Sequence, residues 1–192
     1  MTTLLRPSLN LLPGYVAALE RGWSPDSLND KATAEEFAAI ASDPAGFIAG
    51  HEDLEALGAP IRLPDDSLAP RLPSFWRWIW DAGFCGAIGL RWQPGTATLP
   101  AHVPGHIGYG VVSWRQGQGH ATRALTLLLP QAWSLGLDHV EVVTEPDNVA
   151  SRRVIAACGG LLVERFRTDP AYGGVEKLRF RIARPGMHRE RP

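Results

Sequence analysis

A glycine-rich segment near the middle of the chain has the residue types that can bind a phosphate group. It runs from Gln116 to Thr122 with the sequence Gln-Gly-Gln-Gly-His-Ala-Thr, between an apolar segment and a helical pattern of apolar residues. Small residues let backbone N–H groups come close to an anion, and the positive end of a helix dipole attracts it. The segment therefore predicts a phosphate-binding turn at the start of a helix.

Two common classes of phosphate-binding turn do not fit this segment. A P-loop ends in Gly-Lys-Ser/Thr, whereas Gly119 is followed by His120, Ala121 and Thr122. The dinucleotide fingerprint needs a third glycine or alanine three residues after Gly119, and this position holds Thr122. The pattern thus argues against a nucleoside triphosphatase and against a dinucleotide-binding fold.

A second motif follows the turn. After a predicted strand, Asn148 opens the segment Asn-Val-Ala-Ser, and a helical pattern of small and aliphatic residues then ends in a Gly-Gly pair. Together with Gln116, Gly119 and Ala121, this motif resembles the GCN5-related N-acetyltransferase (GNAT) family, whose turn has the pattern Gln/Arg-x-x-Gly-x-Gly/Ala. The resemblance covers roughly residues 76–182.

The resemblance implies an α/β fold with a mixed, mostly antiparallel β-sheet flanked by helices and a splayed pair of parallel strands that holds acyl-CoA. It also implies an N-acetyltransferase that moves an acetyl group from acetyl-CoA directly to a primary amine of a small molecule or peptide. The residues implied to contact the cofactor are Val111, Val112, Ser113, Gln116, Gly117, Gln118, Gly119, His120, Ala121, Thr122, Asn148 and Ser151.

Two polar residues and two glycines near the implied cofactor site also fit a purely structural role. Asn148 and Ser151 also fit a helix cap and its first turn, and both roles are compatible. Gly108 and Gly110 fit either a bulge in the first splayed strand or close packing beneath a helix.

Acetyl transfer needs a neutral amine, donors for the developing oxyanion and a proton source for the departing thiolate. We expect the oxyanion donor to be the backbone N–H of Val111 or Val112. The family commonly carries a tyrosine as the acid in the helix after the asparagine, but this chain has Val154 and Ile155 at the last two positions of that pattern. Another group, water or unassisted loss of a thiolate with pKa near 8.5 could replace it.

Several residues are candidates for the base that deprotonates the amine. Glu145 follows the second splayed strand, His106 begins the first, Tyr109 lies on the first and Glu141 lies on the second. Glu145 also fits a helix cap, and His106 also fits a strand end in solvent.

Aromatic residues on one strand suggest where the acceptor binds. Trp76, Trp78 and Trp80 alternate, so they share one face of the strand and form either a core block or the wall of an aromatic cleft. Arg91 on the neighbouring strand fits a substrate carboxylate or an exposed strand position. The N-terminal helices are expected to cover this cleft.

Two other functions stay open at this point. Ile155 in place of the expected tyrosine also fits a non-catalytic, regulatory acyl-CoA-binding module. Transfer of a different acyl group, such as succinyl, is the third hypothesis.

Hydrophobic periodicity and turn residues predict the elements that position these groups. An antiparallel meander of three strands should lead, through a β-α-β crossover, to a parallel fourth strand. A capping box formed by Thr33 and Glu36 should start an N-terminal helix, and Pro130 should kink or break the central helix near Leu129 at a cost of about 3 kcal/mol. The predicted strands are 74–80, 85–92, 106–113, 139–144, 161–166 and 175–182, and the predicted helices are 13–22, one from about 32, 121–135 and 148–158.

The composition of the chain limits the number of domains and the class of protein that it can form. With 192 residues, 45% hydrophobic content and a formal net charge of −1, we expect one domain without the basic footprint of a nucleic-acid-binding protein. Residues 1–73 should form a helical part and a loop over 58–73, residues 74–182 the sheet and the CoA-binding core, and residues 183–192 a tail.

The same sequence carries no signal-peptide core and no apolar run long enough to span a membrane, so we expect a cytoplasmic protein that does not act at a membrane. Cys85 and Cys158 are too few for a disulfide framework or a metal site and should be buried thiols. A homodimer is expected by analogy alone.

Overall fold

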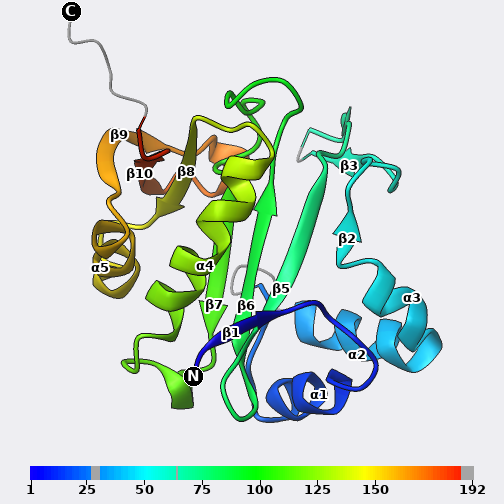
Figure 1. Ribbon diagram of the computed structural model, residues 1–192. Helices are drawn as coiled ribbons and strands as arrows, with labels where there is room; N and C mark the ends of the chain where they lie inside the picture. Colours follow the sequence, from blue (N-terminus) through cyan, green and yellow to red (C-terminus); the bar gives the residue numbers. More distant parts are fainter. Residues whose placement is uncertain (27–30, 64, 187–192) are drawn as a thin grey trace, which may run out of the picture.

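The computed structural model describes residues 1–26, 31–63 and 65–186. A central β-sheet has helices on both of its faces (Figure 1). The helices are α1 (Leu12–Glu20), α2 (Ala32–Ser42), α3 (Pro44–Ala49), α4 (His120–Ser134) and α5 (Val149–Ala157). The strands are β1 (Thr3–Leu5), β2 (Glu52–Asp53), β3 (Ile61–Arg62), β4 (Leu68–Ala69), β5 (Ser74–Trp80), β6 (Phe84–Arg91), β7 (Ile107–Val111), β8 (His139–Thr144), β9 (Leu161–Arg167) and β10 (Glu176–Ala183).

The main sheet has the strand order β1-β5-β6-β7-β8-β10-β9, with β2 paired to β5. Strands β7 and β8 run parallel, while β5, β6 and β7 form the predicted antiparallel meander. The mixed, mostly antiparallel sheet flanked by helices is thus confirmed. The edge strand β1 and the short pair β3–β4 were not predicted, because two- and three-residue strands depend on pairing with distant segments.

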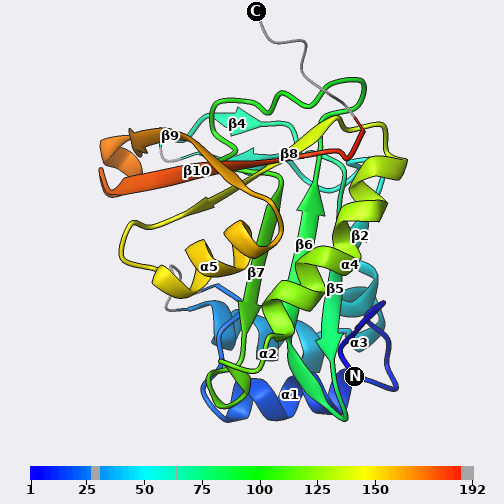
Figure 2. The same cartoon turned by 60° about the vertical axis from the view of Figure 1, so that its left-hand side comes forward.

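The parallel strands β7 and β8 touch at only one end. Within the described residues, their ladder holds the single registered pair Ile107 and Val142. Just before it, the His106 N–H donates to the Glu141 carbonyl at 2.8 Å. Beyond this point the two strands diverge, as Figure 2 shows, and α4 connects them as the expected crossover. A gap therefore opens between β7 and β8 toward the end of β7.

Helices α4 and α5 pack on one face of the sheet. Leu125 and Leu128 of α4 and Ile155 of α5 are fully buried there. The predicted break near Leu129 is wrong, because α4 continues through Pro130 to Ser134. Proline removes one backbone hydrogen bond, and the burial of Leu125 and Leu128 before it and of Ala132 after it offsets that cost.

Helices α1, α2 and α3 cover the opposite face over β5 and β6. The predicted capping box is wrong: α2 begins at Ala32 with no side-chain cap, and Glu36 instead accepts a hydrogen bond from the Tyr15 hydroxyl at 2.9 Å. Both cysteines are free; Cys85 is buried as expected, whereas Cys158 is only half-buried.

Candidate functional site

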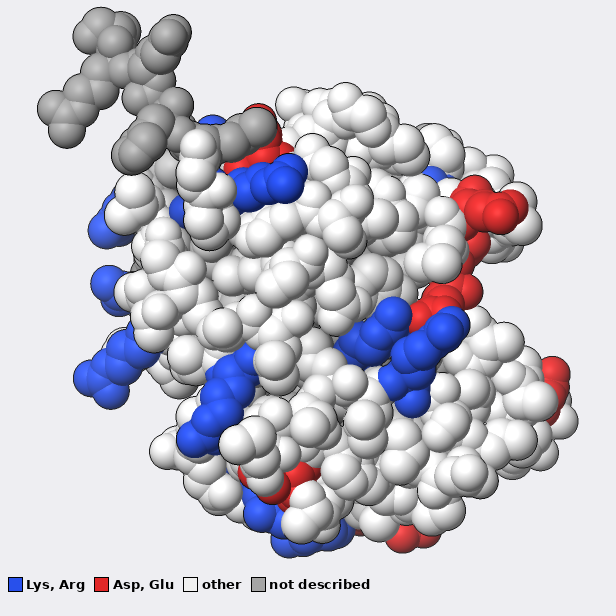
Figure 3. Space-filling view, in the orientation of Figure 1, with Lys and Arg blue, Asp and Glu red and all other residues white. Residues whose placement is uncertain are grey.

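The glycine-rich turn leads from β7 into α4. Gly117 and Gly119 have φ angles of 73° and 80°, in the left-handed region that favours glycine. Gly119 is the N-cap of α4 and supplies no side-chain cap, so no capping side chain occupies the N–H groups of the first helical turn. Figure 3 shows basic side chains at the lower left, where Figure 1 places the start of α4, with a smaller number of acidic atoms among them. The uncapped N–H groups and the excess of basic side chains both favour an anion.

The turn is held from behind by the first residues of the chain. The His120 side chain is buried, and its Nδ1 lies 2.9 Å from the Thr2 hydroxyl. Arg123 donates to the Gln118 carbonyl at 2.9 Å and so fixes the tip of the turn. His120 thus offers a ligand its backbone N–H and not its imidazole.

The hydrogen bonds of β7 show which of its backbone N–H groups face the gap. The Val112 N–H donates to the Cys85 carbonyl of β6 at 3.0 Å, so it is not free to stabilise an oxyanion. Because successive N–H groups of a strand point to opposite edges, those of Val111 and Tyr109 point toward the gap. The Val111 carbonyl accepts from the Gln116 side chain at 3.1 Å. Ser113 lies in a 3-10 turn (Ser113–Arg115) after the strand, since β7 ends at Val111.

A cavity of about 830 Å³ lies between the N-terminal helices and strands β5, β6 and β7. Trp76 and Arg91, two of the residues predicted to bind the acceptor, line it, and Gly108 and Gly110 form part of its floor. Its volume suits a small-molecule ligand. Strand β7 therefore borders the cavity on one side and the β7–β8 gap on the other.

Two comparisons bear on this arrangement. A family model described as an acetyltransferase (GNAT) domain matches residues 21–160. The chain belongs to the GNAT acetyltransferases. Membership assigns acetyl transfer to the chain, with acetyl-CoA as the donor.

Solved GNAT structures share the fold at low sequence identity. The microcin C7 self-immunity acetyltransferase MccE, solved with acetyl-CoA and AMP, is 15% identical with a TM-score of 0.61 over 95% of this chain and 92% of its own. RimJ of Mycobacterium smegmatis, solved with CoA-disulfide, is 18% identical with a TM-score of 0.60 over 97% and 83%. RimL, a ribosomal L7/L12 α-N-protein acetyltransferase solved with coenzyme A, is 14% identical with a TM-score of 0.60 over 95% and 93%. Comparison with curated protein sequences gives no match.

In this GNAT chain, Tyr109 reaches from β7 to α5. Its hydroxyl lies 2.9 Å from the Ser151 hydroxyl, and the Asn148 side chain accepts the Ser151 N–H at 3.0 Å. Asn148 is thus a helix cap, one of its two predicted roles. Burial raises the pKa of Tyr109 to about 12, so the phenol stays protonated near neutral pH. Tyr109 is suited to donate a proton and not to act as the predicted base.

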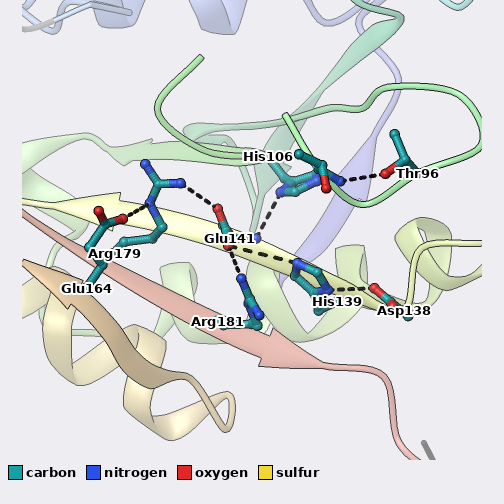
Figure 4. Close-up of polar contacts among 9 residues, drawn as sticks. Thr96, His106, Asp138, His139, Glu141, Glu164, Arg179 and Arg181 are labelled. Carbon is teal, nitrogen blue, oxygen red and sulfur yellow. Dashed lines mark hydrogen bonds and ion pairs between the residues drawn. The ribbon is translucent and has the colours of Figure 1, made fainter. Parts of the chain in front are cut away.

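His106 and Glu141 belong to a buried polar cluster on β7, β8 and β10 (Figure 4). The His106 Nδ1 accepts the Glu141 N–H at 3.0 Å, so its neutral imidazole carries the proton on Nε2. Burial lowers the pKa of His106 to about 4. His106 is not at a strand end in solvent, and the nitrogen that could accept a proton is already occupied. It therefore ties β7 to β8.

Glu141 and Glu145 are both held in ion pairs. Glu141 contacts Arg181 at 2.6 Å and Arg179 at 3.0 Å. Burial alone would raise the pKa of Glu141, but the hydrogen bonds and charges of these two arginines outweigh it and lower the pKa. Glu145 contacts Lys177 at 2.6 Å, and the side-chain cap of α5 is Asn148 and not Glu145. The cavity border includes neither carboxylate.

The two tryptophans predicted to bind the acceptor, Trp76 and Trp78, lie in different environments. Trp78 is fully buried and stacks on Tyr15 at 4.8 Å between ring centroids, so it belongs to the core and not to the cavity wall. Trp76 lies over Gly89, where a Cβ atom would come within 2.7 Å of the indole. Sequence reasoning thus placed the shared face correctly but could not say which indole α1 covers.

Several cavity residues were missed by sequence reasoning, which predicted only that N-terminal helices would cover the cleft. They are Tyr15, Trp23, Glu36 and His51. Burial raises the pKa of Glu36 and lowers that of His51, so burial favours the neutral form of each. Aromatic and titratable residues on helical segments were the available signal, but their faces depend on tertiary packing.

The described residues contain neither a membrane-spanning helix nor a cluster of metal-binding side chains. None of their helices is both long and apolar enough to cross a membrane. In the same part of the chain, no group of three or more His, Cys, Asp or Glu side chains is placed to hold a metal ion.

Proposed function

We propose that this GNAT acetyltransferase transfers the acetyl group of acetyl-CoA to a primary amine bound in the 830 Å³ cavity. The observation that carries the proposal is the position of β7. Its end leads into the glycine-rich turn, one of its edges faces the gap to β8, and Gly108 and Gly110 reach the cavity. A donor in the gap and an acceptor in the cavity would meet across this strand.

The donor is proposed to lie along β7. Its pyrophosphate would accept hydrogen bonds from the N–H groups of residues 117–122, and its pantetheine would pair with the free edge of Tyr109 and Val111. The phosphates lie beyond the end of β7 and the gap closes at Ile107, so the acyl end reaches the strand near Gly108. This places the thioester beside the cavity floor.

The reaction requires one bond to form and one to break. The amine nitrogen attacks the acetyl carbonyl, and the N–H group of Tyr109, which lies next to Gly108, faces the developing oxyanion, while the Val111 N–H stays paired with pantetheine. The C–S bond then breaks, the CoA sulfur takes a proton from the Tyr109 hydroxyl, and the amine releases its own proton to solvent, from which the Tyr109 phenolate is reprotonated. Tyr109 would thus replace the tyrosine that the family carries where this chain has Ile155, which is fully buried.

The test is the release of CoA thiol from acetyl-CoA by the purified protein, with and without a panel of primary amines and short peptides. Calorimetric titration with acetyl-CoA, and with ATP and NAD as controls, is run in parallel. We expect saturable binding of acetyl-CoA alone and thiol release that depends on an amine. Binding without amine-dependent release would instead support the acyl-CoA-binding module, and no binding would leave the turn without a ligand.

A further inference from the structure

Arg91 is a half-buried positive charge that no acidic side chain of the described residues neutralises. It is the last residue of β6, it is half-buried, and its guanidinium borders the cavity. Across residues 1–26, 31–63 and 65–186, its guanidinium has no hydrogen-bond or ion-pair partner. Its backbone N–H donates normally to the His106 carbonyl at 2.9 Å, so the strand itself is well formed.

Other arginines on the sheet differ in this respect. Arg77 on β5 contacts Glu52 at 2.5 Å, and Arg179 and Arg181 on β10 share Glu141. A charge removed from water is costly unless it is paired, and burial accordingly lowers the pKa of Arg91. An arginine left unpaired beside a cavity is available to an anionic ligand, and carboxylates match its planar fork.

The position of Arg91 limits how far the anionic group of such a ligand lies from its amine. The Arg91 Nη2 is 3.9 Å from the point where a Cβ on Gly108 would stand. Gly108 is also where the acyl end of the donor is proposed to reach β7. The attacking amine and the group bound by Arg91 are therefore only a few bonds apart.

We propose that the acceptor is a small amine with a carboxylate a few bonds from its amino group, and that Arg91 binds this carboxylate. The inference rests on the proposed function and narrows its acceptor. A peptide N-terminus presents a neutral amide at the corresponding place and would leave Arg91 unpaired.

The experiment compares acceptors that differ only in this charge. CoA thiol release is measured with the standard amino acids, with their carboxamides and with short peptides, using the wild type, Arg91→Gln and Arg91→Lys. We expect the wild type to prefer at least one carboxylate over its carboxamide by about 30-fold in kcat/KM, the size of one charge-assisted pair. Arg91→Gln should bring this ratio near one by lowering kcat/KM for the carboxylate, and Arg91→Lys should restore part of it.

Arg77→Gln is the matched control, because Arg77 is a sheet arginine that does not border the cavity. It should keep the wild-type ratio, and calorimetric titration with acetyl-CoA reports whether each variant retains its donor site. Transfer to carboxamides or peptides with no carboxylate preference, or a preference that survives in Arg91→Gln, overturns the inference and leaves the proposed function intact. Acetyl-CoA binding with no transfer to any amine in the panel overturns both.

Discussion

The turn proposed to bind phosphate and the cavity proposed to bind the acceptor border the same strand but are built in opposite ways. The turn uses backbone N–H groups from one continuous segment, residues 116–122, and two glycines with positive φ. The cavity uses side chains collected from residues as far apart as Tyr15 and Tyr109. The donor side is thus encoded locally, while the acceptor side depends on how α1–α3 pack over β5 and β6.

Gly119→Glu should abolish acetyl-CoA binding at the turn while leaving the residues of the acceptor cavity unchanged. A glutamate here combines a disfavoured φ of 80° with a negative charge at the phosphate position, so we expect acetyl-CoA affinity to fall below detection in calorimetric titration. Gly136→Glu is the matched control, because Gly136 has a φ of 85° just after the other end of α4. Equal loss of affinity in both variants would contradict the assignment of the turn.

The strand pair that separates the two sides should be sensitive to acid. The pKa of His106 is lowered from 6.5 to about 4, so the neutral imidazole stabilises the fold above pH 6.5 and this contribution is lost as the pH falls toward 4. The groups acting on it are Glu141, which raises its pKa, and His139, Arg181 and Arg91, which lower it.

We expect about 3 kcal/mol of unfolding free energy to be lost between pH 6.5 and 4 through His106. His106→Asn keeps a hydrogen-bond acceptor that does not titrate, so its urea-unfolding free energy should start lower but fall less steeply over this range. An unchanged slope in the variant would show that another group titrates there.

Tyr109→Phe should have the smallest effect, because it removes one hydroxyl where the two sides meet. We expect kcat to drop about tenfold, since a CoA thiolate can also leave without full protonation, while acetyl-CoA affinity stays within about twofold. Because the wild-type phenol has a pKa of about 12, its rate should show no loss attributable to Tyr109 between pH 7 and 10. Ser151→Ala keeps the phenol and serves as the control; a Tyr109→Phe rate equal to that of Ser151→Ala would exclude proton donation.

The same contrast explains what could be predicted from the sequence. Strand β10 alternates apolar and polar residues, and the turn carries its own glycines, so their types and places followed from local patterns. His106 was not placed correctly, because its burial comes from β8 and β10, which lie more than thirty residues along the chain. Arg91 could be named as a candidate, but the lack of a partner for its guanidinium among the described residues is a property of the assembled sheet.

The hydrogen bond between Thr2 and His120 limits how far this chain can be shortened. A fragment that began at β5 would retain the whole glycine-rich turn and both strands beside the gap. It would nevertheless lose the hydroxyl that lies 2.9 Å from the His120 Nδ1, and with it the edge strand β1. A minimal donor-binding fragment must therefore keep the first five residues, although they lie more than a hundred positions from the turn they support.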